Sequence, residues 1–158
     1  MAGHVAIIMG SKSDLEHANK IVEQLRIFGI ECSLRVASAH KSVRHLLEII
    51  EGHNAAGEAL VFIAIAGRSN ALAGMIDANT PYPVITCPPL SSAFAGADIY
   101  SSLRMPGGVA PLVILEPNGA ALAAAKILAL SDSALRDRLT AYQTEMTHSI
   151  IEADKSLR

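Results

Sequence analysis

Four short segments of the sequence bring serine together with small residues or proline, and three of them add a cation. The segments are GSKSD (10–14), SAHKS (38–42), AGRSN (66–70) and PPLSS (88–92). Small residues let backbone N–H groups approach a ligand, and hydroxyls and cations hydrogen-bond to phosphate oxygens. The side chains that this chemistry predicts for a phosphate site are Ser13, Ser38, Lys41 and Arg68. Asp14 does not suit a phosphate, but its carboxylate suits the hydroxyls of a sugar.

A simpler interpretation of these segments stands beside the first. Serine and aspartate are common helix N-caps, so GSKSD by itself requires no ligand. The segment also differs from the G-x-x-x-x-G-K-[ST] loop and from the G-x-G-x-x-G fingerprint, which argues against a nucleoside triphosphate or a dinucleotide. It is the recurrence of such segments that favours a ligand site.

One histidine, His40, lies inside these segments, next to Lys41. Imidazole is the side chain best suited to move a proton near neutral pH, so His40 is the candidate general acid and base. The alternative for His40 is a helix N-cap or a position on a surface loop. Four of the other histidines are expected to lie in or beside helices and to face solvent: His17, His45, His53 and His148.

The two cysteines do not indicate a metal site. Cys32 and Cys87 lack metal-ligand spacing such as C-x-x-C, and no histidine pair or acidic cluster supplies one, so no metal is expected. Cys87 would need a base beside it to act as a nucleophile, and burial in the core is the favoured interpretation. Reduced thiols and a start without a signal-peptide pattern favour a cytoplasmic protein.

Apolar runs of strand length alternate with segments of helical periodicity along the chain. Strands are predicted at 4–9, 31–36, 59–66, 83–88 and 110–115, and helices between and after them, including 71–78, 99–105 and 119–130. Such alternation is typical of a parallel sheet with helices on both faces, which binds ligands outside the carboxyl ends of its strands. The four serine segments follow the first four strands, so we expect them to converge on one cleft.

The last part of the chain, 133–156, has the pattern of an amphipathic helix. Its apolar side chains recur three or four residues apart, at Leu135, Leu139, Tyr142, Met146 and Ile150. This helix has two possible partners, its own domain or a neighbouring subunit. A length of 158 residues suits a single domain, 1–158.

Composition argues against two classes of function. A net charge of −2, with 4% aromatic residues and no Trp, argues against nucleic-acid binding. No apolar run reaches the roughly 18 residues that a membrane span needs, so no membrane association is expected. The hydrophobic fraction of 51% must therefore fill a core or surfaces covered by other subunits, and we expect an oligomer.

Longer motifs resemble the PurE family of purine biosynthesis over nearly the whole chain. They are MGSKSD, SAHK, AGRSNALAGMI, NTPYPVITCPP and SSLRMPGG, in this order. The resemblance implies a three-layer αβα sandwich around a flavodoxin-like parallel sheet of five strands. It also implies a homo-octamer in which the C-terminal helix reaches neighbouring subunits.

The family has two classes that differ in substrate. Class I members are mutases that move a carboxyl group of carboxyaminoimidazole ribonucleotide from the exocyclic nitrogen to a ring carbon. Class II members carboxylate aminoimidazole ribonucleotide (AIR) directly with carbon dioxide. Class I chains usually carry SAHR and GAGGAAHLPGM, whereas this chain has SAHK and AGRSNALAGM and lacks the second histidine. The resemblance therefore favours class II, a carboxy-lyase, with the class I mutase as the alternative.

The resemblance also implies roles for individual residues. It makes His40 the general acid and base, gives Asp14 to the ribose hydroxyls, and gives Ser13, Ser38 and Lys41 to the phosphate, with Arg68 joining them. The remaining residues of the expected substrate site are Gly10, Ser11, Ala66, Gly67 and Ser69. The chemistry requires no cofactor. A non-enzymatic module that binds a phosphorylated ligand is the interpretation outside the enzyme class.

Overall fold

The computed structural model describes residues 3–158, which are built around a sheet of five parallel strands. The strands are β1 (His4–Met9), β2 (Glu31–Val36), β3 (Leu60–Ile65), β4 (Val84–Thr86) and β5 (Leu112–Val113). They lie in the order β2-β1-β3-β4-β5, and every neighbouring pair is parallel. This is the flavodoxin-like order, so the predicted fold class is confirmed.

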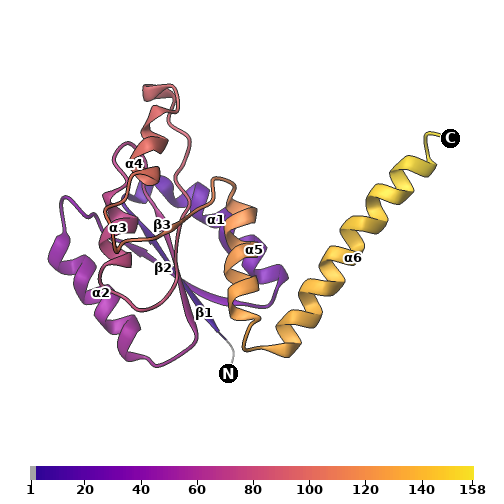
Figure 1. Cartoon of the computed structure of the whole chain (residues 1–158), viewed down its shortest axis with the longest axis horizontal. Helices are drawn as coiled ribbons and strands as arrows, with labels where there is room; N and C mark the ends of the chain where they lie inside the picture. The colour runs from indigo at the N-terminus through magenta and orange to yellow at the C-terminus, as the bar shows by residue number, and fades with distance from the viewer. Residues whose placement is uncertain (1–2) are drawn as a thin grey trace.

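Helices cover both faces of the sheet, as Figure 1 shows. The α-helices are α1 (Leu15–Ile27), α2 (Val43–Ala55), α3 (Ala71–Asp77), α4 (Tyr100–Leu103), α5 (Pro117–Leu128) and α6 (Ser133–Lys155). Three short 3-10 turns are η1 (Lys12–Asp14), η2 (Ser92–Phe94) and η3 (Ala97–Ile99). The α1 and α5 helices share one core with the sheet, and α2 and α3 share the core on its other face.

Side-chain alternation along β1 explains why its apolar run is unbroken. Val5 and Ile7 face the α1/α5 layer, whereas Ala6 and Ile8 face the α2/α3 layer. All four side chains are fully buried. A central parallel strand is covered on both faces, so it has no solvent-facing position for a polar residue.

Some elements depart from the sequence prediction, inside the sheet as well as at its edges. The predicted strand 83–88 shrinks to Val84–Thr86. The β2 strand has the predicted bounds, but Leu34 and Val36 are 38% and 43% exposed because β2 pairs only with β1. The predicted strand 110–115 shrinks to Leu112–Val113, and the predicted helix 99–105 shrinks to Tyr100–Leu103.

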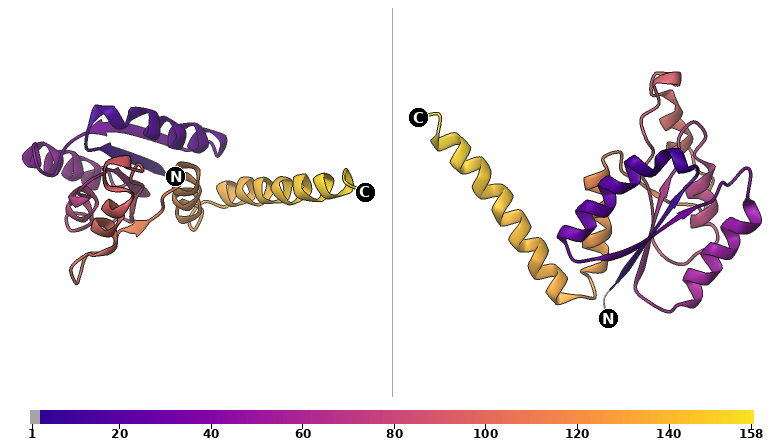
Figure 2. Two further views of the ribbon diagram at one scale, coloured as in Figure 1. Left: turned by 90° about the horizontal axis from the view of Figure 1, so that it is seen from above. Right: turned by 180° about the vertical axis from the view of Figure 1, so that it is seen from behind.

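The α6 helix packs on its own domain only through its first turns. Leu135 and Leu139 are buried in the core, and the ring of Tyr142 meets Phe28 edge-on with centroids 5.1 Å apart. Beyond Tyr142 the helix extends away from the sheet, as both views in Figure 2 show, and Ile150 is 72% exposed. Within residues 3–158 no helix combines the length and apolar character of a membrane span.

Candidate active site

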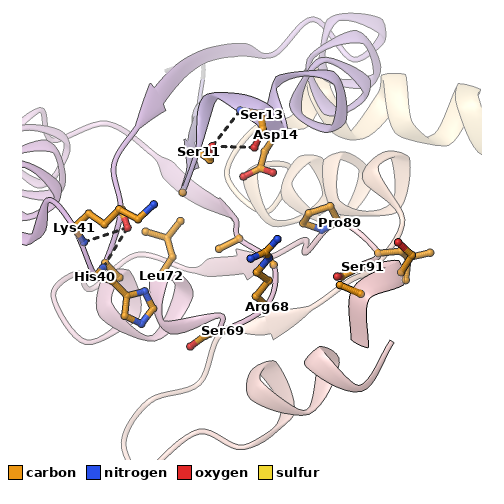
Figure 3. A pocket seen from close by; sticks show the side chains of 18 residues that line it. Ser11, Ser13, Asp14, His40, Lys41, Arg68, Ser69, Leu72, Pro89 and Ser91 are labelled. Atoms are coloured by element: carbon orange, nitrogen blue, oxygen red, sulfur yellow. Dashed lines mark hydrogen bonds between the residues drawn. The ribbon is translucent and has the colours of Figure 1, made fainter. Parts of the chain in front are cut away.

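An open cleft of about 700 Å³ lies beyond the carboxyl ends of β1, β2, β3 and β4 (Figure 3). The structure brings together in this cleft every residue predicted for the site, namely Gly10, Ser11, Ser13, Asp14, Ser38, His40, Lys41, Ala66, Gly67, Arg68 and Ser69. Their shared location is an observation, whereas their individual roles stay predictions. Pro89–Ser92 of the fourth serine segment and Ala39 of the second also line the cleft, as the convergence of the segments predicted, and the sequence did not single out Leu72 and Ala93, which complete the walls.

The first loop of the site is shaped by its own serines. Ser11 Oγ accepts hydrogen bonds from the Ser13 backbone N–H at 3.2 Å and from Ser13 Oγ at 2.9 Å. Ser11 thus caps η1, as the simpler interpretation of GSKSD expected. Asp14 differs, because it occupies the N-cap position of α1 without a side-chain capping bond. Its carboxylate is left to accept hydrogen bonds from a ligand.

Burial raises the pKa of Asp14 above its usual value, and a hydrogen bond with the Ser11 backbone and the nearby His17 oppose that shift. Burial disfavours the ionised form of a carboxyl group because water solvates the charge better than the protein does. The Asp14 carboxyl is thus partly desolvated at the cleft, and its oxygens can accept further hydrogen bonds from a ligand.

The second loop presents His40 and Lys41 to the cleft through a serine turn. Ser38 Oγ accepts hydrogen bonds from the backbone N–H groups of His40 and Lys41, both at 3.3 Å. Ser42 closes the turn, since its Oγ accepts from the Ser38 N–H at 2.8 Å. His40 is thus on an exposed loop, as the alternative interpretation held, but that loop lines the cleft.

The third loop, 66–70, contains a non-glycine residue in the left-handed region. Arg68 has φ 64°, and its backbone N–H donates to Asp98 Oδ2 at 3.1 Å. No ion pair among residues 3–158 involves Arg68 or Lys41. Both charges are therefore available for an anionic ligand, and the N-termini of α1 and α2 add their positive ends at the same edge.

Beneath this loop lies a polar network that the sequence pattern did not reveal. Asn70 is 3% exposed, and its Nδ2 donates to Thr86 Oγ1 and, at 2.7 Å, to Ser102 Oγ. Its backbone N–H donates to Ser101 Oγ at 3.0 Å. The only local signal was an asparagine before a helix, which is normally an N-cap, yet Asn70 makes no capping bond.

The fourth segment is anchored by a histidine that was expected to face solvent. His17 Nε2 lies 3.0 Å from the backbone oxygen of Cys87 and 3.4 Å from its Sγ. Burial lowers the pKa of His17. His17 therefore ties the start of α1 to the end of β4, and the expectation for it was wrong.

Cys87 has a base beside it but lacks the properties of a nucleophile. The residue is 0% exposed, and burial, followed by the nearby Glu116, raises the pKa of its thiol to about 12. A thiol with such a pKa stays protonated at neutral pH and is a poor nucleophile. The structure thus supports burial in the core, which was the favoured interpretation.

The other helical histidines divide into two groups. His53 is half-buried, stacked on His4 with ring centroids 5.7 Å apart, and burial lowers its pKa, so the solvent-facing expectation was wrong for it as well. His45 and His148 are exposed, and each lies within 4.0 Å of a glutamate on its own helix. Within the described residues, no three His, Cys, Asp or Glu side chains are arranged to hold a metal ion.

The fold and the cleft together define a flavodoxin-like α/β protein with a serine-rich, cationic site suited to a small phosphorylated ligand. A family model described as AIR carboxylase matches residues 4–149. The chain therefore belongs to the AIR carboxylase family. The loops that line the cleft also contain motifs by which the sequence resembles the PurE family. Membership makes the protein an enzyme of the carboxy-lyase type.

Similar proteins agree with this family over the full chain. Phosphoribosylaminoimidazole carboxylase of Archaeoglobus fulgidus is 52% identical, across 96% of this chain and 83% of that protein. The enzyme of the same name from Treponema denticola is 47% identical, across 98% and 97%. The crystal structure of Treponema denticola PurE superposes with a TM-score of 0.97 at 46% identity, covering 99% of both chains.

Bifunctional relatives contain a region similar to the whole of this chain. The human bifunctional phosphoribosylaminoimidazole carboxylase/phosphoribosylaminoimidazole succinocarboxamide synthetase is 43% identical across 98% of this chain and 36% of that protein.

Proposed function

We propose that this protein is a class II enzyme that carboxylates AIR with carbon dioxide, reversibly, to form 4-carboxy-5-aminoimidazole ribonucleotide (CAIR), the isomer with the carboxyl group on the ring carbon, in purine biosynthesis. The observation that carries the proposal is the convergence of His40, Lys41, Arg68 and Asp14 on one cleft walled by small residues. Two relatives, of whose length this chain covers 83% and 97%, bear the name phosphoribosylaminoimidazole carboxylase, which supports the same reaction.

Substrate binding follows from the two cationic loops. Lys41 and Arg68 attract the phosphate, and the Ser38 hydroxyl donates to its oxygens. The Ser13 hydroxyl donates to Ser11 Oγ in this structure and would turn from that acceptor to a phosphate oxygen when the substrate binds. Ser38 Oγ already accepts from two N–H groups, so its own O–H remains as a donor toward the cleft. Asp14 accepts hydrogen bonds from the ribose hydroxyls.

The walls of the cleft suit the reacting end of the substrate. The residues expected along the imidazole ring and the carboxyl group are Gly10, Ser11, Ala66 and Gly67, and Ser69 lines the same cleft. Carbon dioxide is neutral and apolar, so short side chains leave room for it without binding it through charge. Holding both reactants beside each other replaces a bimolecular encounter by an oriented one, which lowers the entropic part of the barrier.

His40 carries the proton transfer in this proposal. Electron donation from the exocyclic amine makes the ring carbon nucleophilic, and that carbon forms a bond to carbon dioxide and becomes tetrahedral. The His40 imidazole then takes the proton from this carbon, and the electron pair of the broken C–H bond restores the aromatic ring. In reverse, His40 protonates the carbon and carbon dioxide leaves. General acid-base catalysis of this kind contributes about a hundred- to ten-thousandfold in rate.

The choice of class is tested by the substrate. Purified protein is given either AIR with bicarbonate and carbon dioxide, or the isomer that already carries the carboxyl group on the exocyclic nitrogen. Formation of CAIR from AIR supports class II. If CAIR forms only from the carboxyamino isomer, the protein is a class I mutase.

His40→Asn separates an enzyme from a binding module. The variant should lose turnover by about a hundredfold or more while it still binds AIR in calorimetry, because the amide cannot move the proton. His45→Asn is the matched control, since His45 is an exposed histidine on α2 outside the cleft. If the wild type binds AIR but shows no turnover, the protein is a non-enzymatic module that binds a phosphorylated ligand.

The assembly belongs to the same proposal. We propose that residues 1–158 form a single PurE-like domain whose α6 helix joins copies into an octamer. The exposed Met146, Ile150 and Ile151 beyond the domain contact support this interface. Sedimentation equilibrium tests it, and a monomeric wild type at micromolar concentration would refute it.

A further inference from the structure

The backbone of Arg68 is held in a conformation that its own residue type does not favour. A Cβ atom makes the left-handed region unfavourable, so a non-glycine residue stays there only when its surroundings enforce it. Arg68 has φ 64°, and it lies in the loop between β3 and α3 that lines the cleft. Within the loop itself, the backbone around Arg68 is bridged by one hydrogen bond, which the Ser69 N–H donates to the Gly67 oxygen at 2.9 Å.

The restraint on this loop comes from a segment about thirty residues further along the chain. Asp98 Oδ2 accepts the Arg68 N–H at 3.1 Å. Ser101 Oγ accepts the Asn70 N–H at 3.0 Å and donates to the Asp98 backbone oxygen at 2.8 Å. These bonds tie Asp98 and the start of α4 to both sides of Arg68.

We propose that Asp98 is a positioning residue, which fixes the left-handed backbone of Arg68 and thereby places the guanidinium group in the cleft. Figure 3 shows the Arg68 side chain among the cleft residues, on the side of Asp14 and Pro89. Asp98 does not line the cleft itself. Its effect on the substrate therefore passes through Arg68, and this inference rests on the proposed role of Arg68 in binding AIR.

A carboxylate suits this position for a physical reason. A hydrogen bond from a backbone N–H to an ionised carboxyl is stronger than one to a neutral acceptor, so it can offset the strain at Arg68. Asp98 contacts the backbone of Arg68 and forms no ion pair with its guanidinium. The charge of Arg68 thus stays available to the ligand while its backbone is held.

Loss of Asp98 is expected to weaken substrate binding without removing the chemistry. If the binding conformation of the loop falls to about one molecule in ten, the apparent affinity falls about tenfold. Asp98→Ala should therefore raise KM for AIR about tenfold with little change in kcat, because His40 is on another loop. Asp98→Asn should recover most of the affinity, since the amide oxygen still accepts the Arg68 N–H.

The control is a second aspartate that makes the same kind of bond elsewhere. Asp77 Oδ2 accepts the Ala110 N–H at 2.8 Å, 33 residues away, and Asp77 does not line the cleft. Asp77→Ala should keep the wild-type KM. In an Arg68→Ala background, Asp98→Ala should add no further loss of affinity, because the group through which it acts is gone. An equal or larger second loss would overturn the proposal.

A readout without ligand keeps this test separate from the proposed function. Arg68→Gly should melt about 2–4 °C above Arg68→Ala, because glycine adopts the left-handed region without the Cβ penalty. In an Asp98→Ala background that difference should shrink or reverse, since nothing then enforces the conformation. An unchanged difference overturns the role of Asp98 even if AIR is the substrate. A protein that shows the difference but does not turn over AIR would instead refute the proposed function.

Discussion

The buried Asn70 provides the sharpest test of how the site is held together. Asn70→Ala removes the donor to Thr86 Oγ1 and Ser102 Oγ, and these residues are 0% and 2% exposed. Each buried polar group left without its partner costs about 1–3 kcal/mol. The sum is about 2–6 kcal/mol, and the lower half is expected because Asn70 Oδ1, which has no partner among the described residues, is removed as well.

The assay is urea unfolding followed by circular dichroism at one fixed protein concentration. Such a loss would be a large share of the about 5–15 kcal/mol that stabilises a typical domain. Asn79→Ala is the control, because Asn79 is exposed and its Nδ2 donates to the Met75 oxygen at 2.7 Å. Its free energy of unfolding should change by less than about 1 kcal/mol.

A double-mutant cycle shows whether the network is the cause. Thr86→Val removes one hydroxyl at nearly constant volume, so Asn70→Ala should cost about 1 kcal/mol less in that background than in the wild type. The reasoning is refuted if Asn70→Ala costs less than about 1 kcal/mol, or if the cost is the same in both backgrounds.

Three further outcomes follow from the groups around the cleft. Burial raises the pKa of Asp14 above 3.8, so the stability that the protonated carboxyl contributes is lost as the pH rises from 3.8 through the folded-state pKa. Asp14→Asn should therefore melt higher than the wild type at neutral pH, while KM for AIR rises. A lower melting temperature of the variant would contradict this. Burial lowers the pKa of His17 below 6.5, so the unfolded chain gains protons first and wild-type stability falls as the pH drops below 6.5. His17→Gln should flatten that slope in denaturation midpoints, and an equally steep variant would disprove the assignment. Because the pKa of the Cys87 thiol is about 12 and the residue is 0% exposed, Cys87 should resist iodoacetamide in the native protein. Peptide mass spectrometry should find Cys32 modified first, and the reverse order would show that Cys87 is accessible.

The central strands and the location of the cleft were readable from local patterns. An unbroken apolar run such as HVAIIM requires burial on both faces, and the structure makes His4–Met9 a central strand. Parallel strands place their carboxyl ends at one edge, so the serine segments after β1, β2, β3 and β4 had to meet. That geometry needs no knowledge of side-chain contacts, which is why the location of His40, Asp14, Lys41 and Arg68 in one cleft could be predicted.

The edges of the fold were less accessible to the same reasoning. The β5 strand is short beside β4, which itself has only the three residues Val84–Thr86, and periodicity along 110–115 does not report the length of the neighbouring strand. Likewise, the pattern of 133–156 shows one apolar face, but it does not say where along the helix the domain ends. In the structure, the apolar side chains of this helix up to Tyr142 pack on the domain core, whereas Met146 and Ile150 beyond it are exposed.

By itself, the sequence determined which side chains are available for chemistry and which end of the sheet carries them, because both depend on residue type and on strand direction. Only the tertiary structure decided how they are held. The contacts of Asp98 with Arg68, of His17 with Cys87, and of Asn70 with Ser102 join residues from about 30 to 70 positions apart. A local pattern carries no trace of such pairs, since hydrogen bonds across the fold depend on where the packed elements bring two side chains together.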